Sequence, residues 1–364
     1  MLPGGSAVLL AKSSGVMTIT AFDSKRLVPT GPEVVVLDGI GGSLGLRPVF
    51  ALADNGTAVY VTSNVPDRTL VEVTRDGRVT PLLAESGPYK DPRWSPDGRR
   101  LAFEVVDGSL GDIWIYDRQS NTRSRLTSQS ENFYPNWTRD GERIVFVSRR
   151  TGSAGLWWQQ VDGSAPAEPL LPGDDGLLRF PHAITPDGRT LLFRINSAAS
   201  GIDIAAMDLA PGSAPRDVMV GPANEGSPVV SPDGRWMAYV SDATGQNEVY
   251  VTPWPTVGRR AQISAGGGEE AMWNPRGGEL FYRTGAVLVA ATLTERNGLL
   301  ESLRRDTLFT GNFYSQPRWP QYDVSADGSR FVMVQLGKTN AELRVMTHFD
   351  AMALRRLAAR DKAQ

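Results

Sequence analysis

The fold follows from the stretch PRWSPDGRRLAF, Pro92 to Phe103, because its central Ser-Pro-Asp-Gly turn recurs along the chain. Related turns, some of which match the pattern only in part, end at seven further glycines: Gly5, Gly56, Gly141, Gly188, Gly234, Gly277 and Gly328. In such a turn proline presets the backbone, aspartate stabilises the bend, and glycine accepts the left-handed conformation. The turn therefore joins two antiparallel strands wherever it occurs.

The same four segments surround each turn. A short strand with a large last residue precedes it, as at residues 92–94, and an alternating strand follows, as at 101–104. A third strand, as at 113–116, and a more polar fourth, as at 123–126, complete the unit. Four short strands per repeat of about 45 residues are typical of a propeller blade. We therefore expect an all-β fold, a β-propeller of four-stranded blades, with Trp94, Trp137 and Trp273 packed between blades.

The turn spacing contains a longer period. Gly5 and Gly277 are 272 residues apart, and so are Gly56 and Gly328, so the first two repeats resemble the last two. Six repeats of about 45 residues fit this period. We prefer a six-bladed ring over residues 68–349, remnant blades of a preceding propeller over 1–67, and a short C-terminal helical tail over 350–364. A single ring of eight or seven blades is the alternative.

The last repeat lacks a fourth strand of its own. We expect residues 342–346 to form its third strand, after which the chain turns into an Ala/Leu/Arg segment. A strand near residues 78–82 would then complete that blade and close the ring.

Composition limits the function classes. The 38 basic residues are balanced by 40 acidic ones, whereas a nucleic-acid partner needs a basic face. The chain has no cysteine, which excludes disulfides and thiolate metal sites. No apolar stretch approaches the ~20 residues of a membrane helix. We expect a monomeric propeller without a transmembrane segment in this chain.

The repeats resemble the TolB-like PD40 β-propeller family, on the stretch from Pro92 to Phe103 and on residues 231–241. More narrowly, the chain is similar to the propeller region of bacterial membrane Ser/Thr protein kinases at residues 224–226, 236–242, 248–251, 266–269 and 279–283. The resemblance implies a non-catalytic protein-binding or sensory module in a bacterial envelope or signalling protein, periplasmic or otherwise extracytoplasmic; a cytoplasmic location stays open. Kinase signatures are absent here, so any kinase activity would reside in an upstream domain outside this chain.

The sequence offers few candidates for catalysis. The two histidines, His182 and His348, have no nucleophile and acid beside them in sequence. A Gly-x-Ser-x-Gly match at residues 41–45 precedes a predicted strand, whereas a nucleophile elbow requires a helix. The acidic pairs Asp174-Asp175 and Glu269-Glu270 lack the ligand spacing of a calcium loop. We expect no catalytic residue, metal or cofactor; the alternative is a calcium-dependent six-bladed hydrolase or lactonase.

The loops that enter each first strand line one mouth of the channel in a propeller, and they combine aromatic, amide and charged residues. Such a mixture suits recognition of a protein or peptide ligand. The expected binding residues are Tyr89, Lys90, Asp91, Glu131, Asn132, Phe133, Tyr134, Arg179, Phe180, His182, Asn224, Glu225, Glu269, Glu270 and Tyr314.

Overall fold

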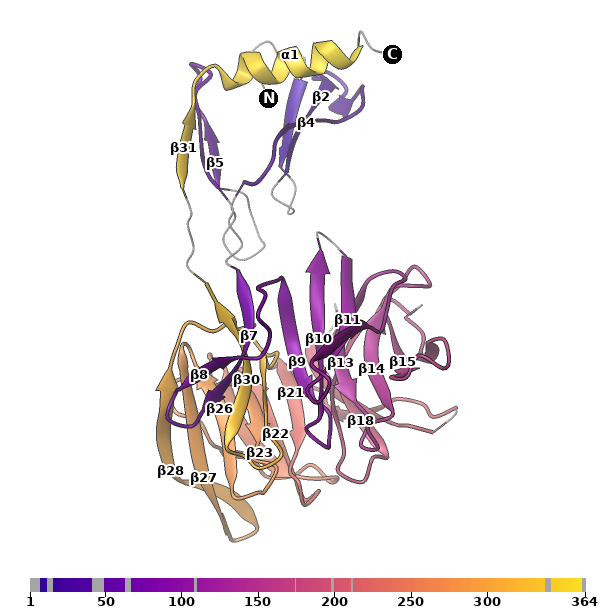
Figure 1. Ribbon diagram of the computed structural model, residues 1–364, viewed down its shortest axis with the longest axis vertical. Coiled ribbons are helices and arrows are strands. Elements are labelled where there is room, and N and C mark those ends of the chain that lie inside the picture. The colour runs from indigo at the N-terminus through magenta and orange to yellow at the C-terminus, as the bar shows by residue number, and fades with distance from the viewer. Residues whose placement is uncertain are drawn as a thin grey trace. The chain divides into compact units, whose positions relative to one another are not determined.

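The computed structural model describes residues 7–11, 16–40, 49–62, 67–107, 110–173, 175–197, 200–210, 212–337 and 342–361. They divide into two compact units, Arg68–Leu336 and a second unit made of Met1–Asp67 with Gly337–Gln364 (Figure 1). In the described residues no helix is long and apolar enough to cross a membrane. The Gly-x-Ser-x-Gly match at 41–45, Asp174 and the turn at Gly5 lie outside the described residues.

The unit Arg68–Leu336 is built of four-stranded antiparallel sheets, which confirms the predicted all-β propeller fold. Five sheets take four consecutive strands each, β9–β12, β13–β16, β17–β20, β21–β24 and β25–β28. The strands are β7 (Arg68–Thr74), β8 (Val79–Pro81), β9 (Tyr89–Trp94), β10 (Arg100–Asp107), β11 (Leu110–Asp117), β12 (Thr122–Arg125), β13 (Asn132–Trp137), β14 (Arg143–Ser148), β15 (Gly155–Gln160), β16 (Glu168–Leu171), β17 (Leu178–Ile184), β18 (Thr190–Ser197), β19 (Gly201–Asp208), β20 (Arg216–Met219), β21 (Glu225–Val230), β22 (Trp236–Ser241), β23 (Glu248–Pro253), β24 (Ala261–Gln262), β25 (Glu269–Trp273), β26 (Glu279–Thr284), β27 (Val287–Arg296), β28 (Leu299–Thr310), β29 (Tyr322–Val324) and β30 (Arg330–Leu336).

A sixth sheet joins the two ends of this unit in the order β29-β30-β7-β8. Figure 1 shows β7, in purple, beside β30, in yellow. The prediction that residues 342–346 form the third strand of this blade is wrong, since β7 takes that place and β8 the outer one. Leu70, Val71 and Val73 of β7 are fully buried there, so the unit ends at Leu336 rather than at residue 349.

Burial explains why the sheets stack. Every residue of β22 is buried, whereas every residue of β12, at the outer edge of its sheet, is exposed. A strand buried on both faces needs a neighbouring sheet on each side, which stacking of blades supplies. The indole Nε1 of Trp137 donates to the Arg93 carbonyl (2.9 Å), and that of Trp273 to the Val229 carbonyl (3.1 Å), each on the preceding sheet. The expected packing of these two tryptophans between blades is confirmed.

The recurrent turn is held by its own side chains. Ser95 Oγ donates to Asp97 Oδ1 (2.5 Å) and accepts from the Arg100 amide (2.8 Å), and Gly98 has φ +69°. Serine or threonine makes the matching bond to aspartate in four other turns, at 138–141, 185–188, 231–234 and 325–328. The turn chemistry of the sequence therefore fixes the hairpin between the first and second strand of each blade.

The second unit contains two small sheets and the helix. Its elements are β1 (Ala7–Ala11), β2 (Met17–Asp23), β3 (Val28–Pro29), β4 (Val34–Leu37), β5 (Phe50–Leu52), β6 (Ala58–Val61), β31 (Leu343–Met346) and α1 (Phe349–Asp361). One sheet joins β1 to β4, and the other runs β31-β6-β5. Phe349, Ala353 and Leu357 of α1 are buried in a core with Ile19 and Tyr60. Because β31 pairs with β6, the propeller unit is inserted between two adjacent strands of one sheet.

Candidate functional site

The innermost strands share an irregularity near their first residues. The register shifts within β9, β13, β17, β21 and β25, where they pair with the second strands. Four residues at or beside these bulges have positive φ: Asp91 (50°), Tyr134 (61°), Ser227 (54°) and Glu270 (56°). A bulge re-aims a side chain, and left-handed non-glycine residues collect at functional sites.

One residue of each second strand stands six positions after the turn glycine, and in the five sheets with a register shift it lies beside that irregularity. In the six sheets it is Glu104, Val147, Arg194, Val240, Arg283 and Val334. The cross-strand neighbours of the three charged members are Lys90, Phe180 and Glu269, each just ahead of the bulge. All three charged side chains are buried, Glu104 to 1% exposure, Arg283 to 4% and Arg194 to 9%.

Glu104 and Arg283 each have a partner on the neighbouring bulge. Burial and the nearby Asp91 carboxyl raise the pKa of Glu104 well above its usual range, and burial raises the pKa of Asp91 as well. The pair therefore holds a proton at a pH where two exposed carboxyls would have lost theirs. Arg283 lies 3.6 Å from Glu270 and donates to the Tyr314 carbonyl at 2.7 Å.

Arg194 has no such partner. It makes no hydrogen bond or ion pair within the part of the chain that the structure describes, and its guanidinium lies 4.5 Å above the Phe180 ring. Burial lowers the pKa of Arg194 to about 10. The bulge position beside it is the dipeptide Phe180-Pro181 and offers no carboxylate.

Residues 311–321, between β28 and β29, cross the mouth of the channel; we call them the plug segment. The side-chain Nε2 of Gln321 donates to Asp91 Oδ1 (2.5 Å), and the backbone N–H of Gln321 donates to Glu270 Oε2 (2.9 Å). Arg318 Nη2 donates to Asp242 Oδ2 (2.7 Å) and to Asn247 Oδ1 (2.6 Å). The plug segment is therefore bonded to three different sheets.

Trp319 of the plug segment fills the space between the innermost strands. Its ring centroid lies 4.1 Å from that of Tyr134 and 4.1 Å from that of His182, and it is 1% exposed. Phe180 packs against it at 6.2 Å. Burial, with Arg194 and Arg93 nearby, lowers the pKa of His182 well below its usual range, so this imidazole is neutral at pH 7.

A cavity of about 320 Å³ lies beside the plug segment, and we call it the mouth cavity. The buried acid pair Asp91 and Glu104 lines it together with Lys90. Phe133 and Phe180 form part of its walls.

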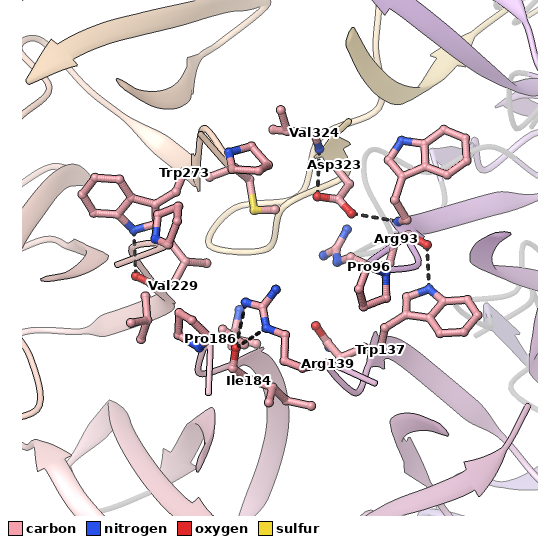
Figure 2. Close-up of a pocket in the computed structure, with 18 residues that line it drawn as sticks. Arg93, Pro96, Trp137, Arg139, Ile184, Pro186, Val229, Trp273, Asp323 and Val324 are labelled. Carbon is pink, nitrogen blue, oxygen red and sulfur yellow. Dashed lines mark hydrogen bonds between the residues drawn. The ribbon is translucent and has the colours of Figure 1, made fainter. Parts of the chain in front are cut away.

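A second cavity, of about 300 Å³, lies at the opposite end of the innermost strands, where the recurrent turns are; we call it the turn-end cavity. All six innermost strands contribute to its lining, together with residues of the turns. Figure 2 shows Pro96, Pro186 and Arg139 around its open centre. Arg139 stands where four of the other turns have proline, and its Nη2 donates to the Ile184 carbonyl at 3.0 Å.

The structure brings about half of the expected binding residues together at the mouth. Those that line the mouth cavity, contact the plug segment or belong to it are Lys90, Asp91, Phe133, Tyr134, Phe180, His182, Glu270 and Tyr314.

The other expected residues are engaged within or between their own loops and strands. Asn132 donates to Asp112, Glu131 pairs with Arg149 and Arg179 with Asp175. The remaining members of this group are Tyr89, which accepts from Arg123, Asn224, which donates to Asp242, Glu225, which accepts from Ser241, and Glu269, which accepts from Asn247. These contacts give each of them a structural role.

Sequence reasoning missed the buried charges and the plug segment. The residues that were missed are Glu104, Arg194, Arg283, Arg318 and Trp319. A signal for the first three was present, because a charge stands inside an otherwise apolar strand, whereas the corresponding residue of the other three sheets is valine. Nothing in the sequence placed Trp319, whose ring partners lie more than a hundred residues earlier.

No group of three or more His, Asp or Glu side chains that could hold a metal ion occurs in the described ranges.

Sequence and structure comparisons place the propeller among known proteins. Residues 71–209 match the TolB beta propeller domain family, PD40. The Tol-Pal system protein TolB of Francisella tularensis subsp. mediasiatica is 32% identical over 171 residues, which cover 46% of this chain and 39% of that protein. The chain thus spans about two fifths of the length of this curated relative.

Solved structures agree on the fold. A TolB-like structure from Agrobacterium tumefaciens superposes with a TM-score of 0.57 at 17% identity, covering 76% of this chain and all of that one. TolB from Acinetobacter baumannii gives a TM-score of 0.50 at 15% identity, covering 93% of this chain and 81% of that one. The predicted resemblance to TolB-like PD40 propellers is confirmed, while the narrower resemblance to kinase-associated propellers stays a prediction.

Proposed function

We propose, on the premise that this chain carries a TolB-like PD40 β-propeller, that it is a non-catalytic protein-binding module of a bacterial envelope or signalling protein. The observation that carries the proposal is the turn-end cavity, whose lining comes from all six innermost strands. A concave site with apolar walls and a few convergent polar groups is the usual form of a ligand site.

The lining of the turn-end cavity indicates what enters it. Val229, Val230 and Met272 supply apolar surface, and Asn136 and Arg139 supply polar groups. A volume of about 300 Å³ suits a few side chains rather than a folded domain. We propose that the partner protein presents a loop or an extended segment with at least one apolar side chain.

The two ends of the channel differ in how far the chain itself fills them. The plug segment occupies the mouth, where Trp319 is 1% exposed, and the turn end has no comparable segment among the described residues. This difference supports the turn end as the main site, and the mouth-loop site stays a second proposal. The relatives named as Tol-Pal system proteins support an envelope association and, with it, an extracytoplasmic location.

Site-specific photo-cross-linking tests this function. A benzoylphenylalanine at position 230, on the wall of the turn-end cavity, is expected to form an adduct with one protein in an envelope extract of the source bacterium. The matched control carries the same group at position 220, where Val220 is 59% exposed outside both cavities. Identical adducts at both positions would contradict a specific site.

A third position distinguishes the two ends of the channel. Benzoylphenylalanine in place of Phe133 reports on the mouth cavity. An adduct at 133 and none at 230 would transfer the function to the mouth loops.

A further inference from the structure

Arg194 is a buried cation without a counter-charge. It is 9% exposed, and neither a hydrogen bond nor an ion pair joins it to any residue that the structure describes. Its guanidinium stacks on Phe180 at 4.5 Å, and its Nε is buried without a partner. Burying a charge is costly unless the charge is paired, so proteins rarely keep such a group without a use for it.

Other donors without a partner occur on the two segments that meet Arg194 at Gly226. A Cβ on Gly226 would lie 3.4 Å from Arg194 Cδ and 3.7 Å from Arg318 Cβ and Cδ, so both arginine side chains pass over this glycine. The next residue, Ser227, is fully buried, and its Oγ has no partner. Arg318 Nε and Trp319 Nε1 are likewise buried without a partner.

We propose that Arg194, Arg318 and Ser227 form a binding site for a carboxylate group, between the sheets β17–β20 and β21–β24. The guanidinium plane of Arg194 presents paired N–H groups that match the two oxygens of a carboxylate. Ser227 Oγ and Arg318 Nε supply further donors to the same anion. The site is assembled from three segments, one of which is the plug segment.

The charge at the site favours a singly charged anion. Arg318 Nη2 is already engaged with Asp242 and Asn247, so Arg194 alone supplies an uncompensated charge. A carboxylate matches one positive charge, whereas a phosphate dianion would be left half compensated. Of the acids on the adjoining elements, Asp203 accepts from Ser200 and Glu225 accepts from Ser241 through Oε1. Glu225 Oε2 is buried without a partner, and burial raises the pKa of this carboxyl.

The walls indicate what carries the carboxylate. Phe180 lies under Arg194, and the Trp319 ring is 5.9 Å from the same guanidinium. These rings suit an aromatic or apolar body attached to the carboxylate. Arg194, Arg318 and Ser227 do not line the turn-end cavity, so this proposal and the proposed function fail or succeed separately.

Calorimetry with phenylacetate tests the site on the full chain. We expect phenylacetate to bind, and its uncharged analogue phenylacetamide to bind at least about tenfold more weakly, because a charge-assisted hydrogen bond is lost. Arg194→Met should reduce phenylacetate affinity by a similar factor, and Arg194→Lys should retain part of it. The matched control is Arg149→Met, since Arg149 lies in the mouth lining but is paired with Glu131 at the surface.

Several results would overturn the site. These are an absence of phenylacetate binding, equal binding of acid and amide, unchanged binding by Arg194→Met, and tighter binding of inorganic phosphate than of phenylacetate. If Arg194→Met does not fold, the same comparison is made with Arg194→Lys, which keeps the charge but loses the bidentate geometry. Phenylacetate affinity equal to wild type in that variant would also overturn the proposal.

Discussion

Arg283 and Arg194 occupy the same place in two sheets of the propeller, yet they have opposite surroundings. Each stands six residues after its turn glycine and is buried on the second strand. Arg283 lies 3.6 Å from Glu270 and donates to two plug-segment carbonyls, of Phe313 and Tyr314. Arg194 has an aromatic ring under it and no bond. The difference teaches that one repeat position can serve structure in one blade and be left for a ligand in another.

The largest effect is expected when Arg283 is removed. Arg283→Met leaves the Glu270 carboxyl buried without its counter-charge, and breaking a buried pair in this way costs about 3–5 kcal/mol. Burial raises the pKa of Glu270 to about 7, above its unfolded value near 4.5. At pH 5 the carboxyl is therefore mostly protonated, and the loss should be smaller than at pH 8. Urea unfolding at both pH values measures it, and a loss that is equal at both would contradict the role of the carboxylate.

A double variant isolates the origin of that loss. Glu270→Gln with Arg283→Met removes both charges, so no buried carboxylate is left without a partner. We expect it to recover about 1–3 kcal/mol of the stability lost in Arg283→Met at pH 8. Urea unfolding of the two single variants completes the cycle. Additive losses would mean that Arg283 acts through the carbonyls of the plug segment and not through Glu270.

Glu104 extends the comparison to the third charged blade, where the partner is another acid. The pKa of the Glu104 carboxyl is raised in the folded state. This carboxyl therefore stabilises the fold fully below its unfolded pKa of about 4.5, and the stabilisation is lost as pH rises through its folded pKa. Glu104→Gln removes this titration. We expect the variant to gain on wild type as pH rises above 4.5, by up to about 1.4 kcal/mol per pH unit for one proton. Stability curves from pH 4 to 9 test the sign, and a gain confined to low pH would contradict it.

The repeat position was visible in the sequence, but its partners were not. The turn, with its Ser/Thr-to-Asp bond, defined the hairpins and so the all-β propeller, because that chemistry is local. Asp91, Tyr134 and Glu270 were expected at the mouth because the segments that enter the first strands of the blades line it. The contacts of Gln321 with Asp91 and of Arg318 with Asp242 join residues far apart in the chain, and no local rule specifies them.

Strand order shows the same limit. Residues 342–346 have a strand pattern, and they do form a strand, but pattern alone does not choose its neighbour. β31 pairs with β6 across the whole inserted propeller, and β7 fills the place that had been expected for it. The fully buried apolar residues of β7 decide that pairing, and their burial is a property of the closed sheet.

The smallest effect is expected for Arg194→Met, and its size decides what Arg194 is for. The variant loses a cation–π contact, worth about 0.5–2 kcal/mol, and is relieved of a buried charge without a partner. These terms oppose each other, so the free energy of unfolding should change by less than about 1 kcal/mol, with either sign. Urea unfolding beside Arg283→Met gives the comparison under one set of conditions. A cost for Arg194→Met as large as that for Arg283→Met would mean that both arginines are structural. A small cost, together with lost phenylacetate binding, would mean that the buried charge is kept for the ligand, because the fold itself does not need it.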